Sequence, residues 1–454
     1  MLFKRVESEG IAHYSYLVGD KNEAVVIDPR RDCDVYVKMS EKQGMSIRYI
    51  LETHRHEDFI VGSVELSAKT GADILHADGH LEYGYGKILA EGKRISVGRL
   101  GIEAIDTPGH TLGSKSYVLY GPEGETWAVF SGDALFAGDV GRTDFMGRDR
   151  LEEMSGLLYE SIQKIIGHDD GTLLCPAHGA GSVCGDSIAD RVWTTIGLER
   201  KLNPKLKHGG KERFVSATAK MLDYPPYFRM MEERNLVGTP RLTEMPSPRS
   251  MSPKEFKYAS KDSIILDART ELGFGSAHVP GSISIWADGI PSFGGWFLPY
   301  DRDILLVADG MEVQKTIRYL ARMGYDNIKG YLVKAMLSWH MAGNASEGII
   351  TKTVQDLCKS IDNGSEDAWI LDVRGDEEIA REGKLPYSHH IHITDLPERK
   401  NEVPKDREVH IFCGSGLRSM TAASLLKREG WKDLVVMLGG ITSWNSLTCP
   451  LEED

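Results

Sequence analysis

The segment at residues 54–59 reads HRHEDF and holds His54, His56 and Asp58, three potential metal ligands within five residues. The apolar run at residues 47–51 predicts a strand directly before it, and a turn at a strand end can aim several side chains at one point. Neutral imidazole and carboxylate together suit zinc or ferrous iron. A single histidine in such a loop is more often simply solvated, so the prediction depends on partners elsewhere.

Three such partners follow later predicted strands. His110 comes after the apolar run at residues 102–105, Asp133 after residues 127–130, and His178 after residues 173–176. Each of these three residues is directly next to a glycine, as expected where a strand ends and a loop begins. The four motifs together therefore predict one metal site. Cys184 lies six residues beyond His178 and either relays sulfur or packs, and the sequence leaves both roles open.

A second reactive segment is the loop CGSGLR at residues 413–418, between a predicted strand at residues 409–412 and a helix that begins near Leu417. The backbone N–H groups of the loop and the helix N-terminus are expected to favour the thiolate of Cys413. Gly414 and Gly416 allow the backbone to curl closely around the sulfur. Arg418 is suited to hold an anionic sulfur donor such as thiosulfate.

Bulk properties limit the class of protein. A chain of 454 residues predicts about three domains. The formal charge of −13 argues against non-specific nucleic-acid binding. Neither a signal peptide nor a long apolar run is apparent, so we expect no membrane association and a cytoplasmic protein. Six cysteines without a C-x-x-C pair are expected to be reduced thiols rather than disulfides.

The C-terminal half repeats itself after a Pro- and Ser-rich segment at residues 239–253, which we interpret as a linker. The strand SIILD at residues 263–267 corresponds to AWILD at residues 368–372, and each is followed by an arginine, Arg269 or Arg374. Both units alternate strands and helices, which predicts two small parallel-sheet α/β domains. The first unit has VADGME at residues 307–312, without Cys or Arg, so we expect it to be catalytically silent.

The four metal-ligand motifs, in this order, resemble the metallo-β-lactamase superfamily, and both repeated units resemble the rhodanese family. Together they resemble persulfide dioxygenase–rhodanese fusions. The implied fold is α/β and α+β multidomain: an αββα sandwich of two mixed sheets, followed by two parallel-sheet rhodanese domains. The expected domains are a dioxygenase domain at residues 1–240, a silent rhodanese-like domain at 250–345 and an active rhodanese at 350–454.

The resemblance also implies the ligands and the cofactor. Phe59 stands where the two-metal members of the superfamily carry a histidine, so we expect one Fe(II) per chain. Its ligands are expected to be His54, His110 and Asp133. His56, His178 and Asp58 are expected to hold water or orient the ligands. Asp58 is also expected to act in catalysis.

The implied reaction oxidises a low-molecular-weight persulfide with O₂ to sulfite and thiol, while Cys413 and Arg418 exchange sulfane sulfur with thiosulfate. Arg142 and Arg200 match arginines that face the thiol in sulfur dioxygenases. Ala180 replaces a tyrosine of glutathione-binding relatives, which favours a pocket open to other anionic persulfides. The sulfur donor is expected to bind along the loop of Gly414, Ser415, Gly416 and Leu417. We expect a homo-oligomer.

Two alternatives compete with this interpretation. The metal site could hold one or two zinc ions, which would make the chain a thioester hydrolase of the glyoxalase II type with an attached sulfurtransferase. Alternatively, the chain could be a non-enzymatic sulfide sensor or scaffold. The complete ligand set and the complete CGSGLR loop argue against the sensor, and oxygen uptake separates the dioxygenase from the hydrolase.

Overall fold

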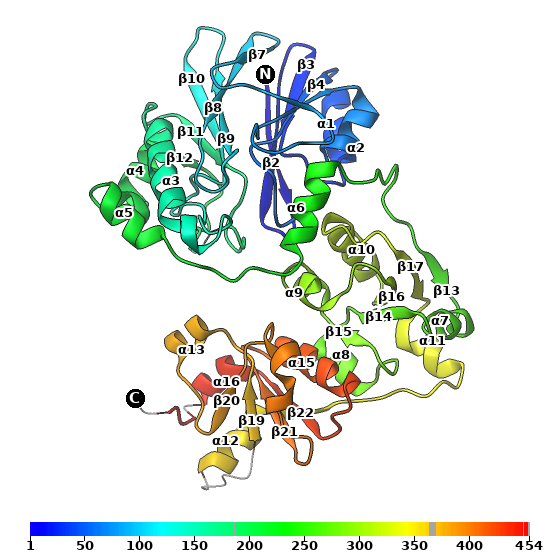
Figure 1. The fold of residues 1–454 in the computed structure, drawn as a ribbon. Helices are drawn as coiled ribbons and strands as arrows, with labels where there is room; N and C mark the ends of the chain where they lie inside the picture. Colours follow the sequence, from blue (N-terminus) through cyan, green and yellow to red (C-terminus); the bar gives the residue numbers. More distant parts are fainter. Residues whose placement is uncertain (186, 363–368, 448, 453–454) are drawn as a thin grey trace. The chain divides into compact units, whose positions relative to one another are not determined.

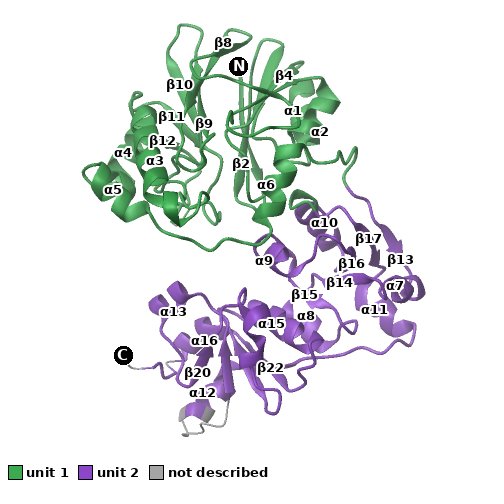
Figure 2. Ribbon diagram, viewed as in Figure 1, with its two compact units in different colours: residues 1–245, 321–324 green, residues 246–320, 325–454 purple. Residues whose placement is uncertain are grey.

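The computed structural model describes residues 1–185, 187–362, 369–447 and 449–452. The chain divides into two compact units, residues 1–245 with 321–324 and residues 246–320 with 325–454 (Figure 2).

Two six-stranded sheets form the first unit (Figure 1). In the first sheet the strands lie in chain order: β1 (Leu2–Ser8), β2 (His13–Asp20), β3 (Glu23–Ile27), β4 (Ser46–Leu51), β5 (Asp73–His76) and β6 (Lys87–Ile88). The order in the second sheet is β12 (Thr194–Thr195), β11 (Leu173–Pro176), β10 (Thr126–Gly132), β9 (Lys115–Tyr120), β8 (Leu100–Asp106) and β7 (Arg94–Val97). Both sheets mix parallel and antiparallel pairs.

The two sheets pack face to face, because alternate apolar side chains of each strand point into one shared core. Val18 and Leu51 of the first sheet lie in one buried cluster with Ile102 and Phe130 of the second. Helices α1 (Asp34–Lys42) and α2 (Ser63–Thr70) pack on the outer side of the first sheet. The outer side of the second is covered by α3 (Leu151–Ile166), α4 (Ile196–Leu202) and α5 (Lys211–Thr218). The predicted αββα sandwich is confirmed.

The second unit contains two five-stranded parallel sheets with the same strand order. The first has the order β13 (Arg249–Met251), β17 (Ile328–Leu332), β16 (Asp303–Val307), β14 (Ser263–Asp267) and β15 (Ile283–Ser284). The second has the order β18 (Ile350–Thr353), β22 (Leu434–Leu438), β21 (Val409–Phe412), β19 (Trp369–Asp372) and β20 (Ser388–His390). The internal repeat and the parallel α/β class are therefore confirmed.

Helices connect the parallel strands, as crossover connections require. The helices of the first repeat are α7 (Pro253–Ala259), α8 (Glu271–Ser276), α9 (Ile290–Phe297), α10 (Glu312–Arg322) and α11 (Ala335–Met341). Those of the second are α12 (Val354–Asp362), α13 (Asp376–Glu382), α14 (Leu396–Arg399), α15 (Leu417–Arg428) and α16 (Gly440–Ser446).

The expected linker at residues 239–253 is wrong at its C-terminal end. Residues 249–251 form the edge strand β13, and α7 begins at Pro253 with a capping box between Ser252 and Glu255. The strand is short and has no apolar pattern, so only its pairing with β17 identifies it. The exact domain bounds remain a prediction.

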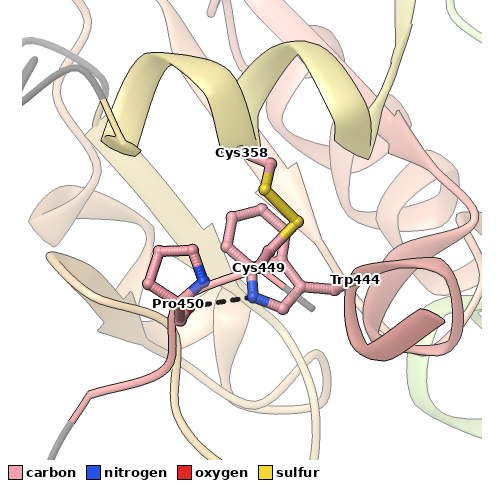
Figure 3. The surroundings of a disulfide bond; sticks show 4 residues. All are labelled: Cys358, Trp444, Cys449 and Pro450. Atoms are coloured by element: carbon pink, nitrogen blue, oxygen red, sulfur yellow. Dashed lines mark hydrogen bonds between the residues drawn. A yellow bond between two sulfur atoms is a disulfide. The ribbon is translucent and has the colours of Figure 1, made fainter. Parts of the chain in front are cut away.

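The expectation that all six cysteines are reduced is also wrong. Cys358 of α12 and Cys449 form a disulfide, and Trp444 donates a hydrogen bond to the carbonyl of Pro450 beside it (Figure 3). The two cysteines are 91 residues apart in sequence, so no local spacing pattern could indicate the pair. Cys33, Cys175, Cys184 and Cys413 are free and buried.

Candidate functional site

Four strand ends bring the predicted metal ligands together. His54 follows β4, His110 follows β8, Asp133 follows β10 and His178 follows β11. All four side chains are buried. The strands anchor them in the sandwich, so their positions depend on the sheet pairing rather than on flexible loops.

His54, His110 and Asp133 converge on one point. Asp133 Oδ2 lies 3.7 Å from His54 Nε2 and 3.5 Å from His110 Nε2. Both Nε2 atoms are buried and have no hydrogen-bond partner among the residues that the structure describes. Buried polar atoms are normally satisfied, so these unpaired nitrogens fit a metal ion that the carboxylate shares.

Hydrogen bonds on the far side of each ring select the nitrogen that faces the metal position. His110 Nδ1 lies 3.0 Å from the carbonyl oxygen of Arg142, which can only accept. Thr53 Oγ1 donates to Asp28 Oδ2 at 2.8 Å and lies 2.9 Å from His54 Nδ1, so it accepts from that ring. In both rings the proton is therefore on Nδ1, and the lone pair is on Nε2.

The electrostatics agree with a cation site. Burial lowers the pKa of His54 well below its usual value and lowers the pKa of His110, which keeps both rings neutral as metal ligands require. Burial alone would raise the pKa of Asp133, but His178 and His54 outweigh it and hold that pKa well below the usual range. Asp133 is therefore an ionised carboxylate between imidazoles.

His178 connects two carboxylates. Its Nδ1 lies 2.8 and 2.9 Å from the two oxygens of Asp133, and its Nε2 lies 3.1 Å from Asp58 Oδ2. Burial lowers the pKa of His178, but Asp133 and Asp58 outweigh burial and raise it well above the usual value. The ring thus contacts both oxygens of Asp133 on one side and Asp58 on the other, and its role in orienting a ligand stays a prediction.

Phe59 occupies the position of the missing histidine. Its ring centroid lies 4.6 Å from that of His56 and 4.1 Å from that of His13, and its side chain is fully buried. His56 Nε2 in turn lies 3.2 Å from Asp28 Oδ1. An apolar ring therefore fills space beside His56, where a histidine would offer a nitrogen to a second metal.

Gly141 permits the close approach of the loop after Asp133. A Cβ atom at this position would lie 1.9 Å from the carbonyl oxygen of Asp133 and 3.2 Å from His110 Nδ1. A side chain there would push apart two of the candidate ligands, so the glycine is required by the packing of the site.

The two arginines predicted to face the substrate are held by other groups. Arg142 is buried and donates to both oxygens of Asp144 at 2.7 and 2.8 Å, and to three backbone carbonyls. Arg200 pairs with Asp170 and with carbonyl oxygens at the end of α3. Ala180 is exposed. Their roles in substrate binding stay predictions.

Sequence reasoning missed Asn235, which lies about 180 residues after the metal loop. It is in helix α6 (Phe228–Val237) and is buried. Its amide donates to the carbonyls of His56 and Phe59 at 2.8 and 2.7 Å and accepts from Val61 N at 3.0 Å. Asn235 thus clamps the HRHEDF loop by three hydrogen bonds, and no sequence signal marked it.

Two further groups approach the metal ligands. Cys184 lies within 4.8 Å of His110 and Asp133, and also within 4.8 Å of Asp58 and His178, measured between potential ligand atoms. Glu57 lies within the same distance of His54 and His110. Burial raises the pKa of both the Glu57 carboxyl and the Cys184 thiol well above their usual values. The sequence placed Cys184 near the site but did not single out Glu57.

The CGSGLR loop lies in the second unit. Cys413 follows β21, is buried, and its Sγ accepts a hydrogen bond from Gly416 N at 3.1 Å. The carbonyls of Cys413 and Ser415 turn away and accept from Ile441 N and Gly439 N. The N–H of Gly416 therefore lies on the sulfur side, where it favours a thiolate.

Arg418 is tied to an acidic partner. Its guanidinium pairs with both oxygens of Glu378 in α13, at 2.5 and 2.6 Å. Burial raises the pKa of Glu378, but the bonds from Arg418 and Gly375 N outweigh it and lower that pKa to about 2. The predicted anion-binding role of Arg418 therefore involves a guanidinium that is already shared with a carboxylate.

Comparisons with known proteins match a different family to each end of the chain. The metallo-beta-lactamase superfamily model matches residues 9–178, and the rhodanese-like domain model matches residues 353–447. The persulfide dioxygenase ETHE1, mitochondrial, of Bos taurus is 31% identical over 227 residues, which cover 46% of this chain and 76% of the relative. The putative sulfurtransferase YtwF of Bacillus subtilis is 40% identical over 85 residues, covering 19% of this chain and 81% of the relative.

A hydroxyacylglutathione hydrolase of Rhodospirillum rubrum is 32% identical over 170 residues. These cover 37% of this chain and 62% of the hydrolase, so the chain spans less than two thirds of that protein. A solved structure, a metallo-beta-lactamase of Staphylococcus aureus, matches with a TM-score of 0.65 at 28% identity and covers 73% of this chain and 98% of its own.

Each helix in the described part of the chain is too short or too polar to cross a membrane. The N-terminal sandwich carries the superfamily's four motifs, and the C-terminal sheet carries the cysteine loop. The chain therefore belongs to the metallo-β-lactamase superfamily in its N-terminal part and to the rhodanese family in its C-terminal part, and is an enzyme of sulfur metabolism organised as a persulfide dioxygenase–rhodanese fusion.

Proposed function

We propose that this chain oxidises a low-molecular-weight persulfide with O₂ at a single ferrous ion, and that its C-terminal domain transfers sulfane sulfur through Cys413. The observation that carries the proposal is the convergence of His54, His110 and Asp133 at a position where Phe59 replaces a further ligand. Two histidines and one carboxylate suit non-haem iron and leave coordination positions open. A bound ferrous ion would supply the redox chemistry of the reaction with O₂.

The protein groups around the metal position have separate tasks. Thr53 and the carbonyl of Arg142 hold the rings of His54 and His110 with Nε2 inward. His178, protonated between Asp133 and Asp58, keeps the carboxylate ligand oriented. Asp58 lies on the other side of His178, where it can accept or return a proton as the substrate thiol is released. Phe59 excludes a second metal ion.

The overall oxidation consumes one persulfide (R–S–SH), one O₂ and one water, and releases one thiol and one sulfite with two protons. At the second site, the thiolate of Cys413 attacks the sulfane sulfur of a donor, forms a cysteine persulfide and releases the donor as thiol or sulfite. Sulfite can then take that sulfur to give thiosulfate and restore the thiolate. The N–H of Gly416 stabilises the negative charge on the Cys413 sulfur in either direction.

In this proposal, residues 1–240 carry out the oxidation and residues 350–454 the sulfur transfer. Residues 250–345 form a catalytically silent rhodanese fold between them in the sequence. The protein acts in the cytoplasm. The missing cysteine in the loop at residues 307–312 supports the silent middle domain. The substrates are small sulfur compounds.

A second candidate is a zinc-dependent thioester hydrolase, which the similarity to a hydroxyacylglutathione hydrolase favours. Anaerobically purified protein separates the two. For the dioxygenase we expect about one iron per chain and oxygen uptake that depends on a persulfide. His110→Ala should lose this oxygen uptake. Two zinc ions per chain, with thioester hydrolysis and no oxygen uptake, would establish the hydrolase instead.

A further inference from the structure

Glu57 is a carboxylate of the HRHEDF loop to which the predicted metal set gives no task. Its side chain is fully buried, and its Oε2 has no hydrogen-bond partner among the residues described. Oε2 lies 3.8 Å from His110 Nε2. Glu57, His54 and His110 each offer a ligand atom within 4.8 Å of the other two. Three buried, unpaired lone-pair atoms thus face one another.

The neighbouring arginine does not satisfy this oxygen. Arg55 Nη2 lies 3.5 Å from the other oxygen, Oε1, which is long for a hydrogen bond, and it is shared with Glu232 Oε1 at 3.2 Å. A buried carboxylate oxygen without a partner is costly. The two histidines cannot supply a proton to Oε2 either, because His54 and His110 carry theirs on Nδ1, which faces away.

A metal ion would satisfy all of these atoms at once. The ion that the two histidines and Asp133 are placed to hold would lie beside Glu57, because His110 Nε2 is 3.8 Å from Glu57 Oε2 and 3.5 Å from Asp133 Oδ2. We propose that Glu57 is a fourth protein ligand of the metal, through Oε2, so that the site is a two-histidine, two-carboxylate centre. The inference rests on the ligand set of the proposed function.

Such a centre differs from a two-histidine, one-carboxylate site in two respects. One fewer coordination position is open to small molecules, and the second carboxylate cancels the remaining positive charge of a divalent ion. Arg55 then acts as a positioning residue, because its ion pair with Oε1 directs Oε2 toward the metal.

Metal affinity tests the proposal without relying on turnover. Glu57→Gln keeps the shape but removes the anionic ligand, so we expect its affinity for both Fe(II) and Zn(II), measured anaerobically against a chelator, to fall about 10–100-fold. The matched control is Glu52→Gln, since Glu52 is equally buried in the same segment but is hydrogen-bonded by Tyr85 instead of facing the metal ligands. Its affinity should stay within about twofold of wild type.

The visible spectrum of the Co(II)-substituted protein should also change in Glu57→Gln and not in Glu52→Gln. Unchanged affinity and an unchanged spectrum in Glu57→Gln overturn the proposal. If that variant does not fold, a crystal structure of the wild-type protein with Zn(II) decides. An Oε2–zinc distance of about 2.0–2.2 Å supports the ligand, and one beyond about 3 Å rejects it. Because Zn(II) binding is measured, the result is independent of whether the chain proves to be a dioxygenase.

Discussion

Phe59 is the residue on which the proposed single metal ion depends. A second ion would need Asp58 and His178, and both are present. Asp58 directly precedes Phe59 in the sequence, and His178 Nε2 lies 3.1 Å from Asp58 Oδ2. The ring of Phe59 packs against His13 and His56 rather than offering a lone pair. In the proposed function, this one side chain therefore separates a one-metal site from a two-metal site.

Replacing Phe59 by histidine should restore the second position. A neutral imidazole beside Asp58 and His178 completes a ligand set that suits zinc, so we expect about two zinc ions per chain in Phe59→His, against about one in the wild type. Elemental analysis after dialysis against Zn(II) measures the ratio. Phe59→Leu, which removes the ring without adding a ligand, should stay at about one, and a second ion in that variant would contradict the role given to Phe59.

At the scale of elements, helix α16 shapes the sulfur-transfer loop. Its first residue, Gly440, has a φ of +48°, and a Cβ there would lie 2.1 Å from the carbonyl oxygen of Cys413. Ile441 N donates to the same carbonyl at 3.0 Å. The start of α16 therefore holds the backbone of the nucleophile in place, and it can do so only without a side chain.

Gly440→Ala should consequently abolish sulfur transfer from thiosulfate to cyanide. The left-handed backbone costs about 1–2 kcal/mol for alanine, and the clash must in addition displace Cys413. Gly430→Ala is the matched control: Gly430 also has a positive φ, +96°, but no atom of the described residues would lie within 4 Å of a Cβ there. This variant should lose only the backbone contribution of about 1–2 kcal/mol and keep its activity. Equal activity in the two variants would argue against control of the loop by α16.

The disulfide between Cys358 and Cys449 joins helix α12 to the segment that follows α16 (Figure 3). It links residues 91 positions apart, which restricts the unfolded chain strongly. Cys449→Ser should lower the free energy of unfolding by about 2–4 kcal/mol, seen as a lower urea midpoint. Dithiothreitol should bring the wild type to the same midpoint and leave the variant unchanged. A wild type that is insensitive to the reductant would show that the disulfide adds no stability.

At the scale of the whole molecule, the two candidate chemistries belong to different compact units. The metal ligands lie within residues 1–245, and Cys413 lies within residues 325–454. The loop of the middle repeat has no cysteine, so all sulfur transfer is expected to depend on Cys413.

The two activities should therefore be separable by single substitutions in the full chain. We expect Cys413→Ser to lose all transfer of sulfur from thiosulfate to cyanide while keeping persulfide-dependent oxygen uptake, and His110→Ala to do the reverse. Paired assays on both variants measure this. Residual sulfur transfer in Cys413→Ser would mean that the middle domain is active, and lost oxygen uptake would mean that the sites are coupled.

Local sequence patterns were enough to predict the fold classes and the main candidate ligands. Strands, helices and the positions of His54, His110, Asp133 and Cys413 follow from local patterns, because an apolar run that ends at a polar, glycine-rich turn is visible within about ten residues. The absence of a ligand at Phe59 and of a cysteine in the middle loop was visible in the same way.

The contacts between distant residues, in contrast, are visible only in the folded chain. Asn235 reaches the metal loop from a helix far along the chain, and Cys358 meets Cys449 across 91 residues. Arg142 was predicted to face the substrate, but in the structure it donates hydrogen bonds to Asp144. The unpaired Oε2 of Glu57 faces His110. Such contacts depend on how sheets and helices pack, and packing brings together residues whose separation in sequence carries no local signal.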